Sequence, residues 1–256
     1  MHNPSFDDDI TFLVSSCDKY SDLWDPFFTS LFRQWKNISF DVVLVSNYKV
    51  YTDERVRTIK LGEDEAYADN LRRALSKIDT EWILLWLDDV ILNRSVDEKK
   101  FQTILDQVNY FGADFVKLSS DMPISYSKDD KALIGELPEG IRYRSGIGLT
   151  LARKQTLLDL AQPGSSAWDM DKIDPATVTN ARFFALTNYG RKNSPFGYIH
   201  AVVKGRWLYN APRKLKKEGF EHILSGRERQ SLLAFLYILI YHAYLSLYRI
   251  LNIYWK

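Results

Sequence analysis

The sequence contains one cysteine, Cys17, among 256 residues. A single cysteine excludes an internal disulfide and a cysteine-based zinc site, and it is typical of a reducing compartment. The formal net charge is only +1, which argues against a dedicated nucleic-acid binder. The acidic first nine residues lack an apolar stretch, so they are not a secretory signal. The sequence therefore predicts a cytoplasmic protein whose partners do not include nucleic acid.

Hydrophobic residues make up 46% of the chain and aromatic residues 14%, enough to bury the core of one domain. The charge is spread unevenly. Residues 204–256 hold ten Lys/Arg and three Glu, a net charge of +7, which leaves −6 for residues 1–203. A mildly acidic body with a basic tail indicates an anionic surface as the partner of the tail.

The stretch from Glu81 to Leu92 is the longest apolar segment of the body, and two adjacent carboxylates, Asp88 and Asp89, interrupt it. Such a run is typical of a strand buried on both faces of a parallel sheet. Open α/β sheets bind ligands outside the carboxyl ends of their strands. Because burying an unpaired charge is costly, these acids are expected to hold a cation, a donor or a cationic side chain. The alternative is a strand end in solvent, with both acids capping the next turn.

Other apolar patterns flank this stretch on both sides. Strands are predicted over residues 10–15, 41–46, 56–61 and 114–119, and helices from Pro26 (with Asp25 as its cap), over 66–78 and over 96–111. After a polar loop over 120–140, a strand or hairpin is predicted over 141–151, a helix over 154–160, a capped helix start over 163–171, and short strands over 183–188 and 198–204. This alternation predicts an α/β fold with a mostly parallel sheet and flanking helices.

Three motifs occur in an order that points to a family: the polar loop Ser15 to Asp18 after the first strand, the segment Ala68 to Leu75, and the Leu-Asp-Asp strand end. Together they resemble nucleotide-sugar-dependent glycosyltransferases of the Rossmann-like GT-A fold, especially small bacterial enzymes that assemble surface polysaccharides. The resemblance covers roughly residues 10–205. It implies a catalytic domain over 1–205, with a donor half (1–119) and an acceptor half (120–205).

In that fold the acidic strand end, the DXD motif, holds Mn²⁺ or Mg²⁺, which bridges the diphosphate of the donor. By this resemblance Asp89 is the metal ligand and Asp88 contacts the sugar or ribose. A further metal ligand is implied at His200, although a lone histidine in a strand is more often simply packed. Leu87 stands where the usual motif has its first acid, so the metal requirement stays open.

Further donor-binding residues follow from the same resemblance. They are Ser16, Asp18, Lys19, Asp53, Asn70 and Arg73. Arg72 or Arg73 could hydrogen-bond the phosphates through the guanidinium group. The alternative for either arginine is a solvated helix face.

A second acidic cluster is Trp168-Asp169-Met170-Asp171. Inverting GT-A enzymes place an acid at a helix start, where it takes the proton from the acceptor hydroxyl, so the resemblance implies Asp169 or Asp171 as general base. The alternatives are an ordinary helix cap, or a metal site formed by this cluster in place of the Asp88–Asp89 pair.

The C-terminal segment, 206–256, is predicted to be a basic linker followed by an amphipathic helix. Its unbroken apolar run, Leu232 to Tyr241, is too short to span a bilayer. Polar residues recur on one stripe beyond it, at His242, Ser246, Arg249 and Lys256. Beside a basic cluster, this pattern predicts an in-plane anchor on anionic lipid at the inner face of the cell membrane. The helix could instead dock on the body or pair with a second copy.

The sequence thus predicts a glycosyltransferase that moves a sugar from a nucleotide-sugar donor to a glycan acceptor, lipid-linked and part of O-antigen, capsule or lipopolysaccharide synthesis. Two other functions stay open. A sugar-1-phosphate nucleotidylyltransferase shares the architecture, but the loop after the first strand has no glycine to bind a triphosphate. A catalytically inactive GT-A-like membrane adaptor is consistent with the incomplete acidic triplet.

Overall fold

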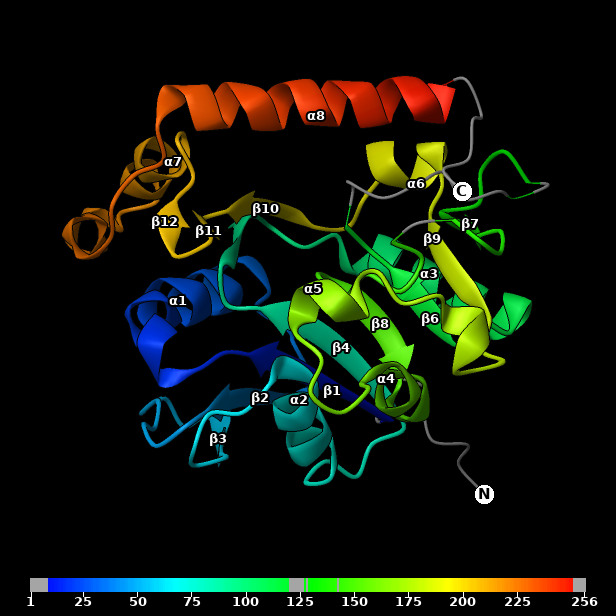
Figure 1. Ribbon diagram of the computed structural model, residues 1–256, viewed down its shortest axis with the longest axis horizontal. Coiled ribbons are helices and arrows are strands. Elements are labelled where there is room, and N and C mark those ends of the chain that lie inside the picture. Colours follow the sequence, from blue (N-terminus) through cyan, green and yellow to red (C-terminus); the bar gives the residue numbers. More distant parts are fainter. Residues whose placement is uncertain (1–8, 120–126, 128, 142, 251–256) are drawn as a thin grey trace.

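The computed structural model describes residues 9–119, 127, 129–141 and 143–250. An eight-stranded sheet runs through the middle of the molecule, in the strand order β3-β2-β1-β4-β8-β6-β9-β7 (Figure 1). The strands are β1 (Ile10–Ser15), β2 (Asp41–Ser46), β3 (Val56–Lys60), β4 (Trp82–Leu87), β6 (Phe115–Lys117), β7 (Ile134–Glu136), β8 (Thr150–Arg153) and β9 (Phe183–Leu186).

Strand β1 lies between β2 and β4 and is parallel to both, and β3 is parallel to β2. Strands β6 and β9 are also parallel, whereas β8 is antiparallel to β4 and β6, and β7 is antiparallel to β9. The predicted α/β class with a mostly parallel sheet is therefore confirmed. The carboxyl ends of β1, β2 and β4 meet at one edge of the sheet.

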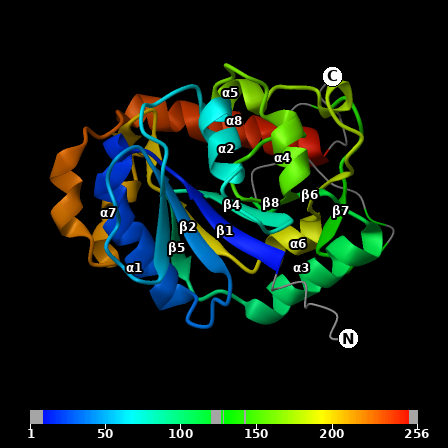
Figure 2. The same cartoon turned by 90° about the horizontal axis from the view of Figure 1, so that it is seen from below.

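Helices cover both faces of the sheet (Figure 2). One face carries α1 (Trp24–Gln34) and α3 (Glu98–Phe111), and the other carries α2 (Tyr67–Leu75), α4 (Lys154–Leu160) and the short α5 (Ala167–Met170). Along β1, Phe12 and Val14 pack with the first group of helices and Leu13 with the second. Every second residue faces the same side of a strand, so a continuous apolar strand supplies both cores.

Two small two-stranded sheets adjoin the acidic end of β4. One pairs β5 (Val90–Arg94) with β10 (Gly197–His200), and the other pairs β11 (Val202–Val203) with β12 (Arg206–Trp207). The strand predicted to end at the acidic pair is confirmed, since β4 ends at Leu87, directly before Asp88 and Asp89. The chain turns at Asp88 and Asp89, and its second apolar half enters a different sheet.

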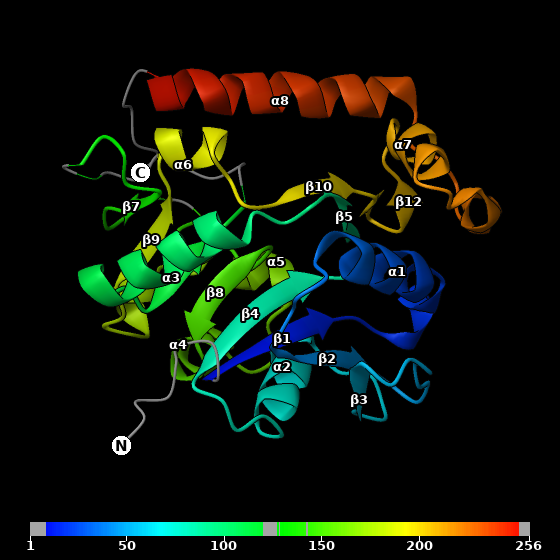
Figure 3. The same cartoon turned by 180° about the vertical axis from the view of Figure 1, so that it is seen from behind.

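The remaining helices follow in the C-terminal half: α6 (Asn188–Lys192), α7 (Ala211–Lys217) and α8 (Leu232–Ile250). The 3₁₀ turns are η2 (Asp18–Leu23), directly after β1, and η3 (Pro175–Thr177) and η4 (Glu221–Gly226) in the C-terminal half. Helix α8 extends along one side of the molecule, beyond α6 and β10 (Figure 3). Among the helices of the described residues, none combines the length and the apolar character needed to cross a membrane. The predicted domain boundary at 205 stays a prediction, but Trp207, Leu215 and Phe220 belong to the same core as β1.

Two local predictions are wrong. Helix α1 begins at Trp24 with Leu23 as its N-cap, so Asp25 lies in the first turn and does not cap it. Of the strand or hairpin predicted over 141–151, only the end is a strand, at the start of β8. Ser145, in the segment before it, is buried and donates its hydroxyl to the carbonyl of Met170. That contact holds the segment in an irregular path.

Candidate functional site

The turn that carries Asp88 and Asp89 is fixed by the residues around it. The indole Nε1 of Trp86 donates a hydrogen bond to the carbonyl of Val90 at 2.6 Å, across the turn. The backbone N–H of Ala201, after β10, donates to the carbonyl of Asp89 at 2.8 Å. The large sheet and the small sheet thus both hold the acidic turn, at the carboxyl end of β4.

Asp88 is 6% exposed and is held by the end of β1. The hydroxyl of Ser16 donates to Asp88 Oδ2, and the indole N–H of Trp24 donates to the same hydroxyl at 2.7 Å. This chain of hydrogen bonds orients one carboxylate oxygen. Asp89 is half-buried and faces the same cavity.

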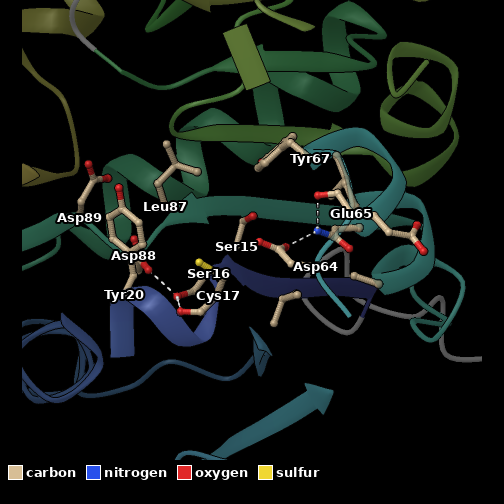
Figure 4. A pocket seen from close by; sticks show the side chains of 14 residues that line it. Ser15, Ser16, Cys17, Tyr20, Asp64, Glu65, Tyr67, Leu87, Asp88 and Asp89 are labelled. Carbon is tan, nitrogen blue, oxygen red and sulfur yellow. Dashed lines mark hydrogen bonds between the residues drawn. The ribbon is translucent and has the colours of Figure 1, made fainter. Parts of the chain in front are cut away.

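A pocket of about 330 Å³ opens beside this pair, between the ends of β1, β2 and β4 and the start of α2 (Figure 4). Its polar lining is Ser15, Ser16, Cys17, Tyr20, Asp64, Glu65, Tyr67, Asn70, Asp88 and Asp89, and its apolar lining is Val45, Leu71, Ala74 and Leu87. A pocket with one apolar wall and several convergent polar groups is the usual form of a small-molecule site.

Burial raises the pKa of both acids of the turn. For Asp88 the pKa lies well above its ordinary range because of burial and the negative charge of Asp89, and the hydrogen bond from Ser16 partly offsets this. For Asp89, burial raises the pKa to about 7. Positive charge near this pair is thus energetically favoured.

A basic side chain that acts on this pair is Arg227, whose charge lowers the pKa of both acids. Arg227 is already paired, since its Nε donates to Asp22 at 2.7 Å and its guanidinium lies 4.3 Å from the centre of the Tyr20 ring. The acidic pair is therefore only partly compensated by the described protein groups.

Three of the predicted donor-binding residues, Ser16, Asn70 and Asp88, line the pocket together. The amide Nδ2 of Asn70 donates to Asp64 at 2.8 Å. Arg73 instead contacts the segment before α2, through the carbonyl of Leu61 and an ion pair with Glu65 at 3.4 Å.

The other predicted donor-binding residues lie outside this pocket. The carboxylate of Asp18 accepts hydrogen bonds from the backbone N–H groups of Asn47, Tyr48 and Lys49, and Lys19 is exposed beside a second cavity. Asp53 forms an ion pair with Arg55 at the surface. Their role in donor binding stays a prediction.

The two acids predicted as general base have different surroundings. Asp169 is exposed at α5 and forms a capping box with Ser166, whose hydroxyl and backbone N–H lower the pKa of this carboxyl. Asp171 Oδ1 accepts the backbone N–H of Ile147 at 3.0 Å. Asp171 and Asp88 both raise the pKa of Tyr67, after the larger effect of burial, which together bring it to about 12. Tyr67 is thus close to both acidic clusters.

A buried lysine lies beside Asp171. Lys117 is 6% exposed, at the end of β6. Its ammonium lies 2.3 Å, and Asp171 Oδ1 3.3 Å, from the point that a Cβ on Gly146 would occupy. The absence of a side chain at Gly146 therefore makes room for a cation and an anion to come close.

His200 is exposed on β10, opposite Val90 of β5, so it is a neighbour of Asp89 across the small sheet. Within the described ranges, no three His, Cys, Asp or Glu side chains gather in a way that could hold a metal ion. The metal ligands implied by the resemblance thus stay a prediction.

Several pocket residues were not predicted. Tyr20 and Tyr67 follow polar stretches, and only the position of Tyr20 after the first strand could have indicated a site residue. Arg227 and Lys117 do not line the pocket, and they were not predicted as site residues because their neighbours come from distant parts of the chain.

The sequence matches no model of a known protein family and no curated protein. Among solved structures, the chain is similar to S. aureus TarS, with 11% identity and a TM-score of 0.43, over 70% of this chain and 36% of that one. A structure of TarS 1–349 in complex with UDP has 13% identity and a TM-score of 0.43, over 70% and 60% of the two chains. A197 from STIV has 16% identity and a TM-score of 0.42, over 76% and 86%. The chain thus spans less than two thirds of the TarS chains that it matches.

Proposed function

We propose that this protein is a GT-A-type glycosyltransferase that transfers a sugar from a nucleotide-sugar donor to a glycan acceptor. The observation that carries the proposal is the pair Asp88 and Asp89, which is turned into a pocket at the carboxyl ends of three parallel strands with both pKa values raised. Acids kept in such a position at an energetic cost are typical of functional sites.

The two ends of the pocket suit the two ends of a nucleotide sugar. The apolar wall of Val45, Leu71 and Ala74 fits a base, whose faces are apolar. The acidic end at Asp88 and Asp89 fits the diphosphate only with a cation between them, because two carboxylates and a diphosphate repel one another.

We place Mn²⁺ or Mg²⁺ at this end, held by Asp89 with His200 as a second ligand. The raised pKa of Asp89 supports this choice, since burial without a full positive partner is the state that a divalent cation relieves. Such cations commonly take one or two protein ligands and complete their shell with phosphate oxygens and water. When bound, the cation supplies Lewis-acid stabilisation of the leaving diphosphate.

Asp171 is the better candidate for the general base, because the carboxylate of Asp169 is engaged in the capping box with Ser166. In the proposed reaction, the acceptor oxygen forms a bond to the anomeric carbon as the bond to the diphosphate breaks. The diphosphate leaves with the bonding electron pair, and Asp171 takes the proton of the acceptor hydroxyl, which gives inversion.

The test is a binding and transfer assay with a matched pair of variants. Nucleoside diphosphates and nucleotide sugars are screened by thermal shift with and without Mn²⁺, and the donor that binds is used to measure transfer. Asp89→Asn is expected to abolish the Mn²⁺-dependent shift, while Asp79→Asn, an exposed acid before β4, leaves it unchanged. Full transferase activity in Asp89→Ala contradicts the proposal, and pyrophosphate release from a nucleoside triphosphate indicates the nucleotidylyltransferase instead.

We also propose that α8 lies on an anionic membrane surface at the cytoplasmic face, near a lipid-linked acceptor for surface polysaccharide. Leu233, Tyr237 and Ile240 are 79%, 71% and 68% exposed. The basic helix α7, with Arg213, Lys214, Lys216 and Lys217, lies near the start of α8 (Figure 1). Apolar and basic groups side by side suit anionic lipid. The side chains expected on the polar stripe at His242, Ser246, Arg249 and Lys256 lie outside the described ones.

Vesicle sedimentation tests the membrane proposal. We expect the protein to bind phosphatidylglycerol vesicles and to bind phosphatidylcholine vesicles weakly. Serine at Leu233, Tyr237 and Ile240 together should prevent binding, whereas Tyr110→Ser, at a side chain 84% exposed on α3, should not. Undiminished binding of the triple variant contradicts the proposal.

A further inference from the structure

A second cavity, of about 730 Å³, lies beside the first. The turn η2 forms the wall between them, because Cys17 and Tyr20 line the first cavity and Asp18, Lys19, Ser21 and Asp22 line the second. The opposite wall comes from the β11–β12 turn and from residues 226–228. We call this second cavity the basic groove.

The basic groove has more cations than its own acids can neutralise. Its basic residues are Lys19, Lys49, Lys204, Arg206 and Arg227, and its acids are Asp18, Asp22 and Glu228. Each acid is already engaged: Asp18 by three backbone N–H groups, Asp22 by Arg227, and Glu228 by Arg206 at 2.9 Å. Lys19 and Lys204 form no ion pair with any residue that the structure describes. Their ammonium groups are thus available to an anion.

Lys204 stands in an unusual backbone conformation. Its φ is 51°, and with Gly205 at 76° it forms the two-residue turn between β11 and β12. Such turns need two residues in the left-handed region and strongly favour Asn-Gly, whereas a lysine there is strained. The conformation of the turn therefore does not explain why residue 204 is a lysine. A need for positive charge at this point of the groove explains it.

Arg227 lines the groove and also contacts a residue of the acidic pocket. Its guanidinium lies 4.3 Å from the centre of the ring of Tyr20, which lines the pocket. An anion bound in the groove would therefore lie next to the pocket of the proposed transfer reaction.

We propose that the basic groove binds a phosphate group carried by the acceptor, with Lys19 and Lys204 as its main contacts. The acceptor role rests on the proposed function, but the binding of phosphate does not. A charge-assisted contact from an ammonium to a phosphate is stronger than a neutral hydrogen bond and fixes position as well as affinity. The groove would thereby select phosphate-bearing acceptors over neutral glycans.

The turn offers a variant that is expected to keep the fold. Lys204→Asn removes the charge and supplies a residue that the left-handed turn favours, so the melting temperature should stay equal or rise. Titration with inorganic phosphate is expected to show about tenfold weaker binding in Lys204→Asn, and weaker still with Lys19→Ala, since each loses one charge-assisted contact. Lys204→Arg should restore most of the affinity. Lys99→Asn, on α3 and lining neither cavity, is the control.

The same variants are then tested with the nucleoside diphosphate that shifts the melting temperature most. Its affinity should be unchanged in Lys204→Asn. An equal loss of both affinities assigns the groove to the donor, and an unchanged phosphate affinity removes the site altogether; either result overturns the proposal. The proposal is also overturned if Lys204→Asn binds phosphatidylglycerol vesicles less well but binds phosphate as before, because the lysines then bind lipid. If no nucleoside diphosphate binds, the proposed function fails while the phosphate titration still decides the groove.

Discussion

Two pairs of acids, both close to Tyr67, show how position in the fold separates residues that look alike in sequence. Asp88 and Asp89 end a central strand and are held inside a pocket, where burial raises both pKa values. Asp169 and Asp171 lie on and after a short surface helix, and the pKa of Asp169 is lowered by its hydrogen bonds to Ser166. The comparison teaches that the first pair lacks nearby positive charge. In the second pair, Asp169 caps the helix and Asp171 accepts the backbone N–H of Ile147.

The largest effect is expected within the second pair. Asp171→Asn should lower kcat by roughly 10²–10⁴-fold, because a general base contributes that much. Asp169→Asn should change kcat little, since its carboxylate serves the helix cap. Steady-state kinetics of both variants with the donor identified by thermal shift decide the assignment. Equal losses in both variants would show that the two acids do not differ in role.

The first pair makes the stability of the metal-free protein depend on pH. The pKa of Asp89 rises from an ordinary 3.8 to about 7 on folding, so the folded state binds the proton more tightly than the unfolded state. The stabilising contribution is full below pH 3.8 and is lost as the pH rises through 7. Urea unfolding between pH 5 and 8 should therefore show a decrease in the free energy of unfolding of roughly 1–4 kcal/mol. Asp89→Asn should reduce this decrease and Asp79→Asn keep it, while the raised pKa of Asp88 contributes the part that remains. An identical decrease in Asp89→Asn would contradict the raised pKa.

The closeness of Lys117 and Asp171 to Gly146 can be tested with two glycines. A Cβ on Gly146 would lie 2.3 Å from the Lys117 ammonium, while a Cβ on Gly148 would meet nothing within 4 Å. Gly146→Ala should displace the ammonium and lower kcat roughly ten- to a hundredfold, the size of effect that an ångström of misplacement produces. Gly148→Ala should retain activity. Similar kinetics for the two variants would mean that Lys117 does not influence the reaction.

The smallest effect is expected at the helix cap. Ser166→Ala removes a hydroxyl that accepts the backbone N–H of Asp169 and donates to its carboxylate. The cost should be about 1 kcal/mol of stability, the usual value of an N-cap, with kcat unchanged. Chemical denaturation measures the first and kinetics the second. A large loss of kcat without loss of stability would instead give Asp169 a catalytic role.

Much of the first half of the fold was predictable because its strands are buried on both faces. The bounds predicted for β1 and β2 agree with the structure, and the helix predicted to stop at Gly112 does so with this glycine in the left-handed conformation. Continuous apolar runs leave few alternatives when both faces of a strand must be covered. The strand end at Asp88 was predicted, but the separate strand after it was not, because only the second sheet shows where those apolar residues pack.

Of the site, the sequence indicated the residues at strand ends and missed those brought in by tertiary contacts. Asp88, Asp89 and Ser16 follow from the rule that carboxyl ends of parallel strands meet. Lys117 ends the short strand β6, and nothing in the neighbouring sequence distinguishes its buried ammonium from an exposed one. Asp18 was predicted from its place after β1, yet three backbone N–H groups occupy its carboxylate.

The ion pair between Asp22 and Arg227 joins residues 205 positions apart in sequence. It holds the segment after β12 against the turn η2, next to the ring of Tyr20. A protein shortened at residue 205, where the sequence alone would divide it, loses this fastening together with Trp207, a fully buried side chain. Trimming for crystallisation or activity assays is therefore best begun after Gln230, whose backbone N–H still bonds to the carbonyl of Trp207.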